Sequence, residues 1–156
     1  MTSPEVGPSP QSQVTLREIT AATVRAVCQL SVDERQARFV APNAVSIAQA
    51  YFSKHAWFRA IDADETPVGF LMLEDRPEKP DYFLWCFMID ARDPAMGFGR
   101  RALELLIEHV RTRPNATELS TSVVQGEGGP QEFYQEMGFE LTGAYHEGEA
   151  VLRLRL

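Results

Sequence analysis

A short glycine-bearing turn stands between the most apolar run of the chain and its longest amphipathic helix. The run is YFLWCFMI, the turn is Gly97-Phe98-Gly99, and the helix is predicted over about Gly99–Arg113. Glycines let the backbone approach a ligand closely, and a helix start presents unpaired N–H groups at the positive end of the helix dipole. Arg100 and Arg101 add positive charge there. The segment favours a diphosphate site, although the two glycines could also serve only to tighten the turn.

The charge of the chain bears on its partners. Its 156 residues include 15 Lys and Arg against 22 Asp and Glu, a net charge of −7. Residues 114–152 hold seven acids and no Lys or Arg, and so account for the whole excess. A duplex nucleic-acid binder needs a basic face, so we expect no nucleic-acid partner. An acid-lined cleft would concentrate a cationic substrate; an acidic exterior that serves only solubility is the alternative.

The sequence lacks the motifs that are typical of several classes of protein. Cys28 and Cys86 form no CxxC pair and the three histidines are scattered, so we expect neither a metal site nor a disulfide framework. The N-terminus has no charged segment followed by an apolar one, and no apolar run approaches the 18 residues that a membrane span needs. We therefore expect a cytoplasmic protein with no membrane partner.

The order of the predicted elements is β-α-α-β-β-β-α-β-α-β-β, an α+β or mixed α/β domain. Residues 1–13 are rich in Pro, Ser and Gln and are predicted to be a disordered tail, followed by one domain over residues 14–156. The strands are expected at VTLREI, WFRAI, VGFLMLE, YFLWCFMI, ELSTSVV, FELTGAY and EAVLRLRL. The helices are expected after Thr20, at about Ser46–Phe52, at about Gly99–Arg113 and in QEFYQEM.

The strand, the turn and the following helix resemble the acetyl-CoA signature (Q/R)-x-x-G-x-(G/A) of the GNAT (Gcn5-related) N-acetyltransferase superfamily. The segment QEFYQEMGFELTG is similar to the late helix of that family. The segments LREIT, RFVAPNAVSIAQAYF, FMIDAR and LLIEHV look like bacterial spermine/spermidine N-acetyltransferases. The resemblance covers the chain after residue 14. It implies a GNAT-like central mixed, mostly antiparallel sheet flanked by about four helices.

The resemblance implies acetyl-CoA as cosubstrate and suggests which residues bind it. The N–H groups of the turn would hold the diphosphate, and the backbone of the preceding strand would hold the thioester carbonyl and pair with the pantetheine arm. Pro94 stands where Gln or Arg is usual, and Glu127 where an Asn is often found. The expected contacts are Phe87, Met88, Ile89, Ala95, Met96, Gly97, Phe98, Gly99, Arg100 and Glu127.

Tyr134 is the predicted general acid. Its phenol, with a reference pKa near ~10, is protonated at pH 7 and could protonate a leaving thiolate whose pKa is near ~8.5. The spacing by itself favours a packing residue of an amphipathic helix, and it is the resemblance that favours the catalytic role.

A base is needed as well, because an alkyl amine with a pKa near ~10.4 is mostly protonated at pH 7. Glu34, in the loop after the first helix, is the predicted base. Asp33 and Glu74 are the other carboxylates expected near the acceptor. All three also fit the description of solvated surface acids.

The resemblance implies a small cationic amine as the acceptor, in the first place a polyamine such as spermine or spermidine. Phe39 and Asn43 resemble the substrate loop of the polyamine branch, and Trp85 could stack on an alkylammonium chain or belong to the core. The alternatives are another amine (an aminoglycoside, an amino acid or a peptide N-terminus) and an acyl-CoA-binding module without catalysis. A homodimer could form through the final strand VLRLRL.

Overall fold

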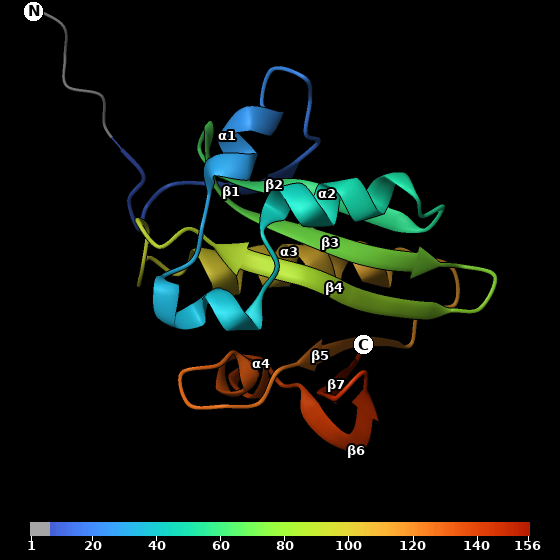
Figure 1. Cartoon of the computed structure of the whole chain (residues 1–156). Coiled ribbons are helices and arrows are strands. Elements are labelled where there is room, and N and C mark those ends of the chain that lie inside the picture. The colour runs from blue at the N-terminus through green and yellow to red at the C-terminus, as the bar shows by residue number, and fades with distance from the viewer. Residues whose placement is uncertain (1–6) are drawn as a thin grey trace, which may run out of the picture.

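The computed structural model describes residues 7–156 and shows a mixed α+β fold built on a seven-stranded sheet, which confirms the expected fold class (Figure 1). The order of the strands in the sheet is β1-β2-β3-β4-β5-β7-β6. The strands are β1 (Val14–Arg17), β2 (Ala56–Ala63), β3 (Thr66–Arg76), β4 (Asp81–Ile89), β5 (Glu118–Val123), β6 (Glu140–His146) and β7 (Glu149–Arg155). The helices are α1 (Val24–Gln29), the 3-10 helix η1 (Glu34–Phe39), α2 (Asn43–Tyr51), α3 (Phe98–Arg111) and α4 (Gln131–Glu136).

The order of the elements matches the predicted one except for η1, which lies in the segment that the sequence predicts to be a loop after the first helix. Asp33 caps η1 by accepting a hydrogen bond from the backbone N–H of Arg35 at 3.0 Å. Helix α2 begins three residues earlier than expected, directly after Pro42, whose ψ of 143° is extended. Proline fixes its own φ near −65° and cannot donate a hydrogen bond, so a helix can start immediately behind it.

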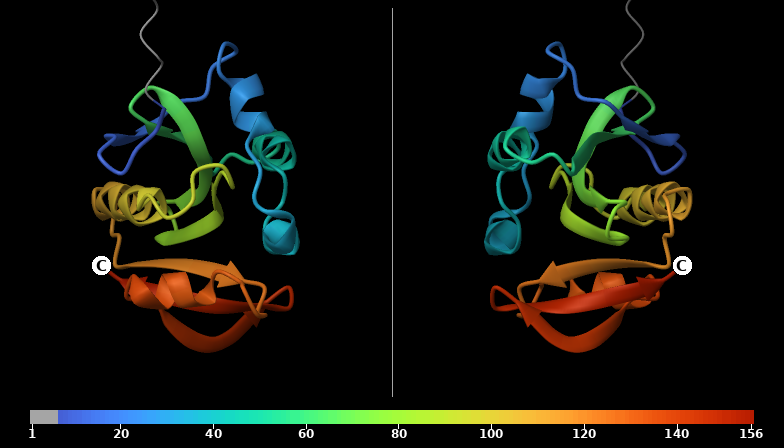
Figure 2. Two further views of the ribbon diagram at one scale, coloured as in Figure 1. Left: turned by 90° about the vertical axis from the view of Figure 1, so that its left-hand side faces the viewer. Right: turned by 90° about the vertical axis from the view of Figure 1, so that its right-hand side faces the viewer.

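Strands β4 and β5 pair over a short stretch only and then part. Their parallel register joins Tyr82 to Leu119, Phe83 to Ser120 and Leu84 to Thr121, and it stops there. The other neighbouring strands of the sheet pair antiparallel. Figure 2 shows the result, with β1 to β4 in one half of the molecule and β5, β6, β7 and α4 in the other.

A β-bulge at Trp85 lies where the two strands part. Met72 of β3 pairs with Cys86 and Leu73 pairs with Leu84, so Trp85 has no partner on β3. Because side chains alternate along a strand, one extra residue exchanges the two faces beyond it. Phe87 therefore packs on the same side as Leu84, against the cluster that α3 covers.

Each face of the first half carries its own buried cluster. Helix α3 covers one face and α1, η1 and α2 cover the other (Figure 2). The face under α3 holds the larger cluster, to which α3 contributes Phe98, Ala102, Leu103, Leu106, Ile107 and Val110. The second cluster joins α1 and α2 to β2, β3 and β4 through Val27, Leu30, Ala50, Ala60, Phe70, Met72 and Met88. The site described below lies where these clusters meet the second half.

Both ends of the chain differ in part from expectation. Residues 1–6 of the predicted tail lie outside the described residues, but Ser9 and Ser12 form a turn in which Ser12 is buried. Strand β7 is paired with β5 along its length and with β6 as far as Arg153, so most of VLRLRL has no free edge for pairing across a dimer. The free edge on that side of the sheet belongs to β6.

Within residues 7–156, no helix has the length and apolar character that a membrane crossing requires.

Gly69 allows β3 to approach the part of β4 that borders the site. A Cβ at this position would overlap the carbonyl oxygen of Met88 and would lie 2.9 Å from Cδ1 of Ile89. We expect Gly69→Ala to lower the free energy of unfolding by about 1–3 kcal/mol, because the added methyl has no space. Denaturant unfolding measures the change. Gly7→Ala is the control, since a Cβ at Gly7 meets nothing within 4 Å; equal stability of both variants would contradict the packing argument.

Candidate functional site

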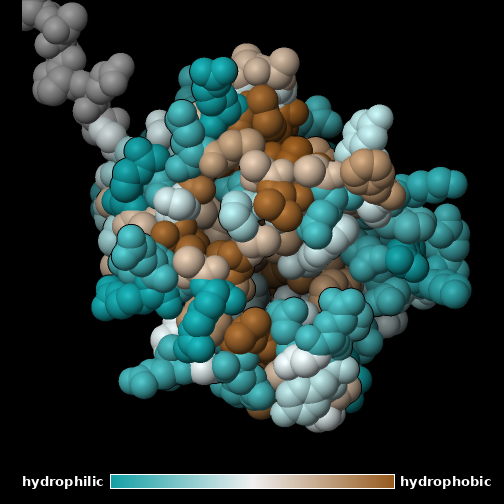
Figure 3. Space-filling view, in the orientation of Figure 1, coloured by the Kyte–Doolittle hydropathy of each residue, from teal (hydrophilic) through white to brown (hydrophobic). Residues whose placement is uncertain are grey.

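A cleft opens between the two halves at the point where β4 and β5 part. It is a cavity of about 310 Å³ with three walls, which are the end of β4, the segment around η1, and the loop that leads into α4. Its lining residues are Val32, Gln36, Phe39, Val40, Phe87, Met88, Ile89, Gly99, Gly128, Gly129, Pro130 and Phe133. None of these side chains is charged, and the space-filling view shows hydrophobic residues reaching this face of the molecule (Figure 3).

The open edge of β4 is the first chemical feature of the cleft. Beyond Leu84, the backbone of β4 has no partner on the β5 side, while its other edge stays paired with β3. Phe87, Met88 and Ile89 of this stretch line the cleft. Their backbone groups can therefore hydrogen-bond to an extended ligand as a further strand would.

The turn between β4 and α3 is the second feature. Ala95 and Gly97 have positive φ values of 57° and 78°, and α3 begins at Phe98 with no side-chain cap. Alternating backbone conformations of this kind aim successive N–H groups at one point. Among the described residues no acceptor binds the N–H groups of Phe98, Gly99 or Arg100. The turn borders a second cavity of about 440 Å³, the turn pocket, which can receive an anion.

Arg101 holds the turn in place instead of lining the turn pocket. Its guanidinium donates to the carbonyl oxygen of Met96 at 2.9 Å and to that of Ser12 at 2.6 Å, and it lies over the ring of Phe98. Arg100 faces another surface, beside Glu104 and Glu136. The sequence analysis attributed the positive charge at the anion site to these two arginines, and the structure directs both side chains elsewhere.

The charged side chains of the turn pocket come from other segments. Asp33, Asp90 and Asp93 line it together with Arg35. Asp90 is buried and pairs with Arg92 at 2.6 Å. Burial and the neighbouring Asp90 raise the pKa of Asp93. Within residues 7–156, Arg35 is the only cationic side chain that lines this pocket.

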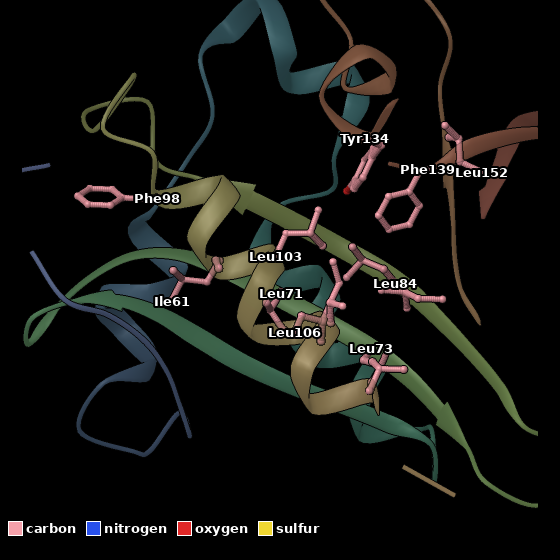
Figure 4. Close-up of a cluster of buried hydrophobic side chains, with 14 of the residues drawn as sticks. Ile61, Leu71, Leu73, Leu84, Phe98, Leu103, Leu106, Tyr134, Phe139 and Leu152 are labelled. Atoms are coloured by element: carbon pink, nitrogen blue, oxygen red, sulfur yellow. The ribbon is translucent and has the colours of Figure 1, made fainter. Parts of the chain in front are cut away.

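Tyr134 projects from α4 toward β4, in the space between the two halves (Figure 4). Its side chain is 5% exposed, and its ring packs edge-on against Phe133 and Phe139, each with its centroid at 5.4 Å. Burial raises the pKa of Tyr134, which a hydrogen bond with Thr121 partly offsets. Thr121 is the last residue of β5 that pairs with β4, so the phenol lies where the two strands part. It is held there in its protonated form.

The three predicted carboxylates lie outside the cleft. Glu34 is exposed and is not among the lining residues of the described cavities. Asp33 caps η1, pairs with Arg35 at 3.2 Å and borders the turn pocket. Glu74 accepts a hydrogen bond from Arg76 at 2.6 Å and lies opposite Phe83, toward the other end of β4. None of the three lines the cleft, and Asp33 shares only the turn pocket with the end of β4 at Ile89.

The remaining predicted residues are divided between the cleft and the framework. Phe39 lines the cleft. Asn43 is buried and donates to the carbonyl oxygen of Val27 at 3.0 Å, so it ties α2 to α1, and it also lines a further cavity beside the cleft. Trp85 forms the bulge and is 37% exposed. Glu127 borders a third hollow, beside Asp33 and Arg38.

The loop before α4 lines the cleft through Gly128, Gly129 and Pro130, whereas only Glu127 of this loop was predicted as a site residue. A Cβ at Gly126 would lie 2.8 Å from Nη2 of Arg38, and one at Gly129 would lie 2.9 Å from Cε1 of Phe39. The sequence GEGGP thus carries glycines because η1 packs directly on the loop. Three glycines within four residues were the available signal, since glycine permits close approach. Gln36 and Phe133 line the cleft as well, and no local pattern distinguishes them.

One protein-family model matches the sequence. The model described as the acetyltransferase (GNAT) family matches residues 24–139, most of the chain. The chain belongs to the GNAT acetyltransferase family. None of the curated proteins matches the sequence.

Solved structures share this fold at low sequence identity. A domain from Methanocaldococcus jannaschii is 13% identical with a TM-score of 0.74, over 94% of this chain and 100% of that one. The PaiA N-acetyltransferase from Thermoplasma acidophilum, solved with coenzyme A, is 12% identical with a TM-score of 0.68, over 92% and 99%. A GNAT family acetyltransferase from Elizabethkingia anophelis, solved with acetyl-CoA, is 14% identical with a TM-score of 0.65, over 92% and 98%. At such identities the likeness establishes the shared fold.

Arg101 provides a test of how the turn of this GNAT protein is held. We expect Arg101→Ala to lower the free energy of unfolding by about 1–3 kcal/mol, because two backbone carbonyls lose a charged donor. Arg100→Ala removes the same charge one residue earlier from a solvated position, and we expect a change within about 0.5 kcal/mol. Thermal unfolding compares the two, and an equal effect of both would show that the turn does not depend on Arg101.

Proposed function

We propose that this protein transfers the acetyl group of acetyl-CoA to the nitrogen of a primary amine. The observation that carries the proposal is that three features lie together at one cleft. A turn with free N–H groups, an unpaired strand edge and a buried, protonated tyrosine meet where β4 and β5 part. Family membership supports the same conclusion.

The cleft and the turn suit the parts of acetyl-CoA. The free N–H groups at the start of α3 can bind the diphosphate, and the unpaired edge at Phe87–Ile89 can bind the amides of the pantetheine arm. The uncharged lining suits the methylene groups of that arm. The Thermoplasma and Elizabethkingia relatives, crystallised with coenzyme A and acetyl-CoA, support the choice of cosubstrate.

Different groups in the cleft then serve different steps of acetyl transfer. Backbone N–H groups at the β4 edge stabilise the negative charge that develops on the thioester oxygen as the amine nitrogen attacks the carbonyl carbon. The C–N bond forms, the C–S bond breaks, and Tyr134 donates its phenolic proton to the departing sulfur. The phenol then regains a proton from solvent.

The acceptor amine must lose a proton, and none of the residues lining the cleft is a carboxylate. We assign this proton to water that reaches the third hollow, where Asp33 and Glu127 lie beside Arg35 and Arg38. Glu34 was the predicted base, and its exposed position outside the cleft favours this water route instead. Glu127 borders this hollow, which shares Asp33 and Arg35 with the turn pocket, so its expected contact with the cofactor stays a prediction.

Tyr134→Phe removes the proposed acid and keeps the packing of the ring. We expect kcat to fall by about 10²–10⁴-fold with little change in the affinity for acetyl-CoA. Because burial raises the pKa of Tyr134, the phenol stays protonated in alkaline solution, and kcat of the wild type is not expected to decline between pH 7 and 9.5. Steady-state kinetics across that range measures both. Unchanged turnover of the variant would reject the role.

Two classes of amine remain candidates for the acceptor, and different observations favour them. A polyamine is favoured by the resemblance in sequence and by the acidic block of residues 114–152. The structure places Glu132, Glu136 and Glu140 of that block at exposed positions.

An amine with an apolar end is favoured by the lining of the site. A further cavity of about 200 Å³, the side pocket, shares Val32, Val40 and Met88 with the cleft. The side pocket too has no charged lining residue in the described part of the chain. Burying a second ammonium there without a partner is unfavourable.

A matched pair of amines separates these candidates. Butylamine and 1,4-diaminobutane have the same carbon chain, and the second amine ends in an ammonium where the first ends in a methyl group. We expect release of CoA thiol from acetyl-CoA to be stimulated by butylamine at least about 10-fold more than by the diamine, because the lining is uncharged. Spermidine is run in parallel. Stronger stimulation by the diamine and spermidine would identify a polyamine enzyme. If no amine stimulates thiol release while acetyl-CoA still binds, the protein is a binding module.

A further inference from the structure

Helix η1 borders both the turn pocket and the cleft. Arg35 and Gln36 line the turn pocket, and Gln36 and Phe39 line the cleft. The helix packs on the opposite half through Arg38 and Phe39, which lie against Gly126 and Gly129. One six-residue helix thus reaches from the proposed diphosphate site to the proposed site of acetyl transfer.

The turn pocket lacks positive charge unless η1 supplies it. Three carboxylates line it, and Arg92 neutralises one of them, Asp90. Neither Arg100 nor Arg101 lines it. Backbone N–H groups alone would have to bind a diphosphate close to Asp33 and Asp93. Such an arrangement is unfavourable for an anion, because like charges at short range repel.

Arg35 can supply the missing charge because its present partner holds it weakly. Its guanidinium contacts Asp33, two residues away, with Nε 3.2 Å from Oδ1, and its side chain is 90% exposed. A solvated ion pair of this kind contributes little to stability. A guanidinium binds phosphate oxygens through two parallel hydrogen bonds, and these are stronger than most other charged contacts.

We propose that Arg35 exchanges Asp33 for the diphosphate of acetyl-CoA, so that η1 closes on the cosubstrate. The proposal rests on the proposed function, because it assumes that acetyl-CoA binds in the cleft. Since Phe39 belongs to the same helix, binding of the diphosphate also fixes one wall of the cleft. The cosubstrate thereby orders the surface that the acceptor meets.

Three ligands locate the contact. CoA, 3′-dephospho-CoA and pantetheine share the arm, and only the first two carry the diphosphate. We expect Arg35→Ala to lower the affinity for CoA and for 3′-dephospho-CoA by about 10-fold each and to leave the affinity for pantetheine unchanged. Calorimetry measures the first two, and competition against CoA measures pantetheine. A loss of affinity for CoA alone would place Arg35 at the 3′-phosphate and overturn the proposal. Equal losses of affinity for all three ligands would also overturn it.

Two further variants test the exchange of partners. Asp33→Asn keeps an acceptor that can cap η1 and removes the competing charge, so it is expected to tighten CoA binding by about 3-fold to 10-fold. Weaker binding by this variant would contradict the exchange. Arg38→Ala removes the same charge from the same helix, outside the turn pocket. We expect it to leave the ratio of CoA to pantetheine affinity unchanged, and a ratio lowered as far as in Arg35→Ala would show only a general effect of charge.

The outcome for the wild type keeps the two proposals apart. If the wild type binds CoA and Arg35→Ala binds it equally well, the role of Arg35 is rejected and the proposed function stands. If the wild type does not bind CoA at all, the proposed function itself fails.

Discussion

The parting of β4 from β5 is the constraint on which the rest of this structure depends. Paired strands satisfy their backbone groups along their whole length, and an unpaired edge inside a domain must find other partners. Here the bulge at Trp85 coincides with the end of the pairing and exchanges the faces of β4 beyond it. Phe87 and Ile89 can then pack toward α3 while the strand edge stays open to the cleft. The same distortion that interrupts the sheet leaves this edge of β4 open toward the cleft.

Segments far apart in the chain close the space that this distortion opens. Helix η1 and the loop of residues 126–130 meet across the cleft, and glycines on the loop allow a contact that larger residues would prevent. Helix α4 adds Phe133 to the lining and buries Tyr134 at the point of divergence. The burial that raises the pKa of Tyr134 comes from this packing of one half against the other. The phenol is thus kept protonated by burial in these tertiary contacts.

Charge is distributed unevenly between the site and the surface. The acids of the C-terminal half are mostly exposed, whereas the residues that line the cleft in residues 7–156 are uncharged. Near the turn, Asp33 and Asp90 each have an arginine partner within two residues of sequence. These two arginines offset part of the negative charge beside the turn, and Asp93 has no such partner among the described residues. The net charge of −7 describes the exterior of this protein better than its site.

Features with a local physical cause were open to prediction from the sequence. The apolar run, the glycine turn and the spacing of Leu103, Leu106 and Val110 determine β4 and α3, and the order of the elements follows from similar patterns. What depends on distant contacts was decided only by the tertiary structure. Arg101 donates to the carbonyl of Ser12, and Asn43 donates to the carbonyl of Val27. Strand β7 lies between β5 and β6, and the sequence does not predict this order of the strands in the sheet. The direction of a long polar side chain is set by whichever acceptor the fold brings near. Sequence periodicity records burial and turn geometry, and it carries no information about such partners.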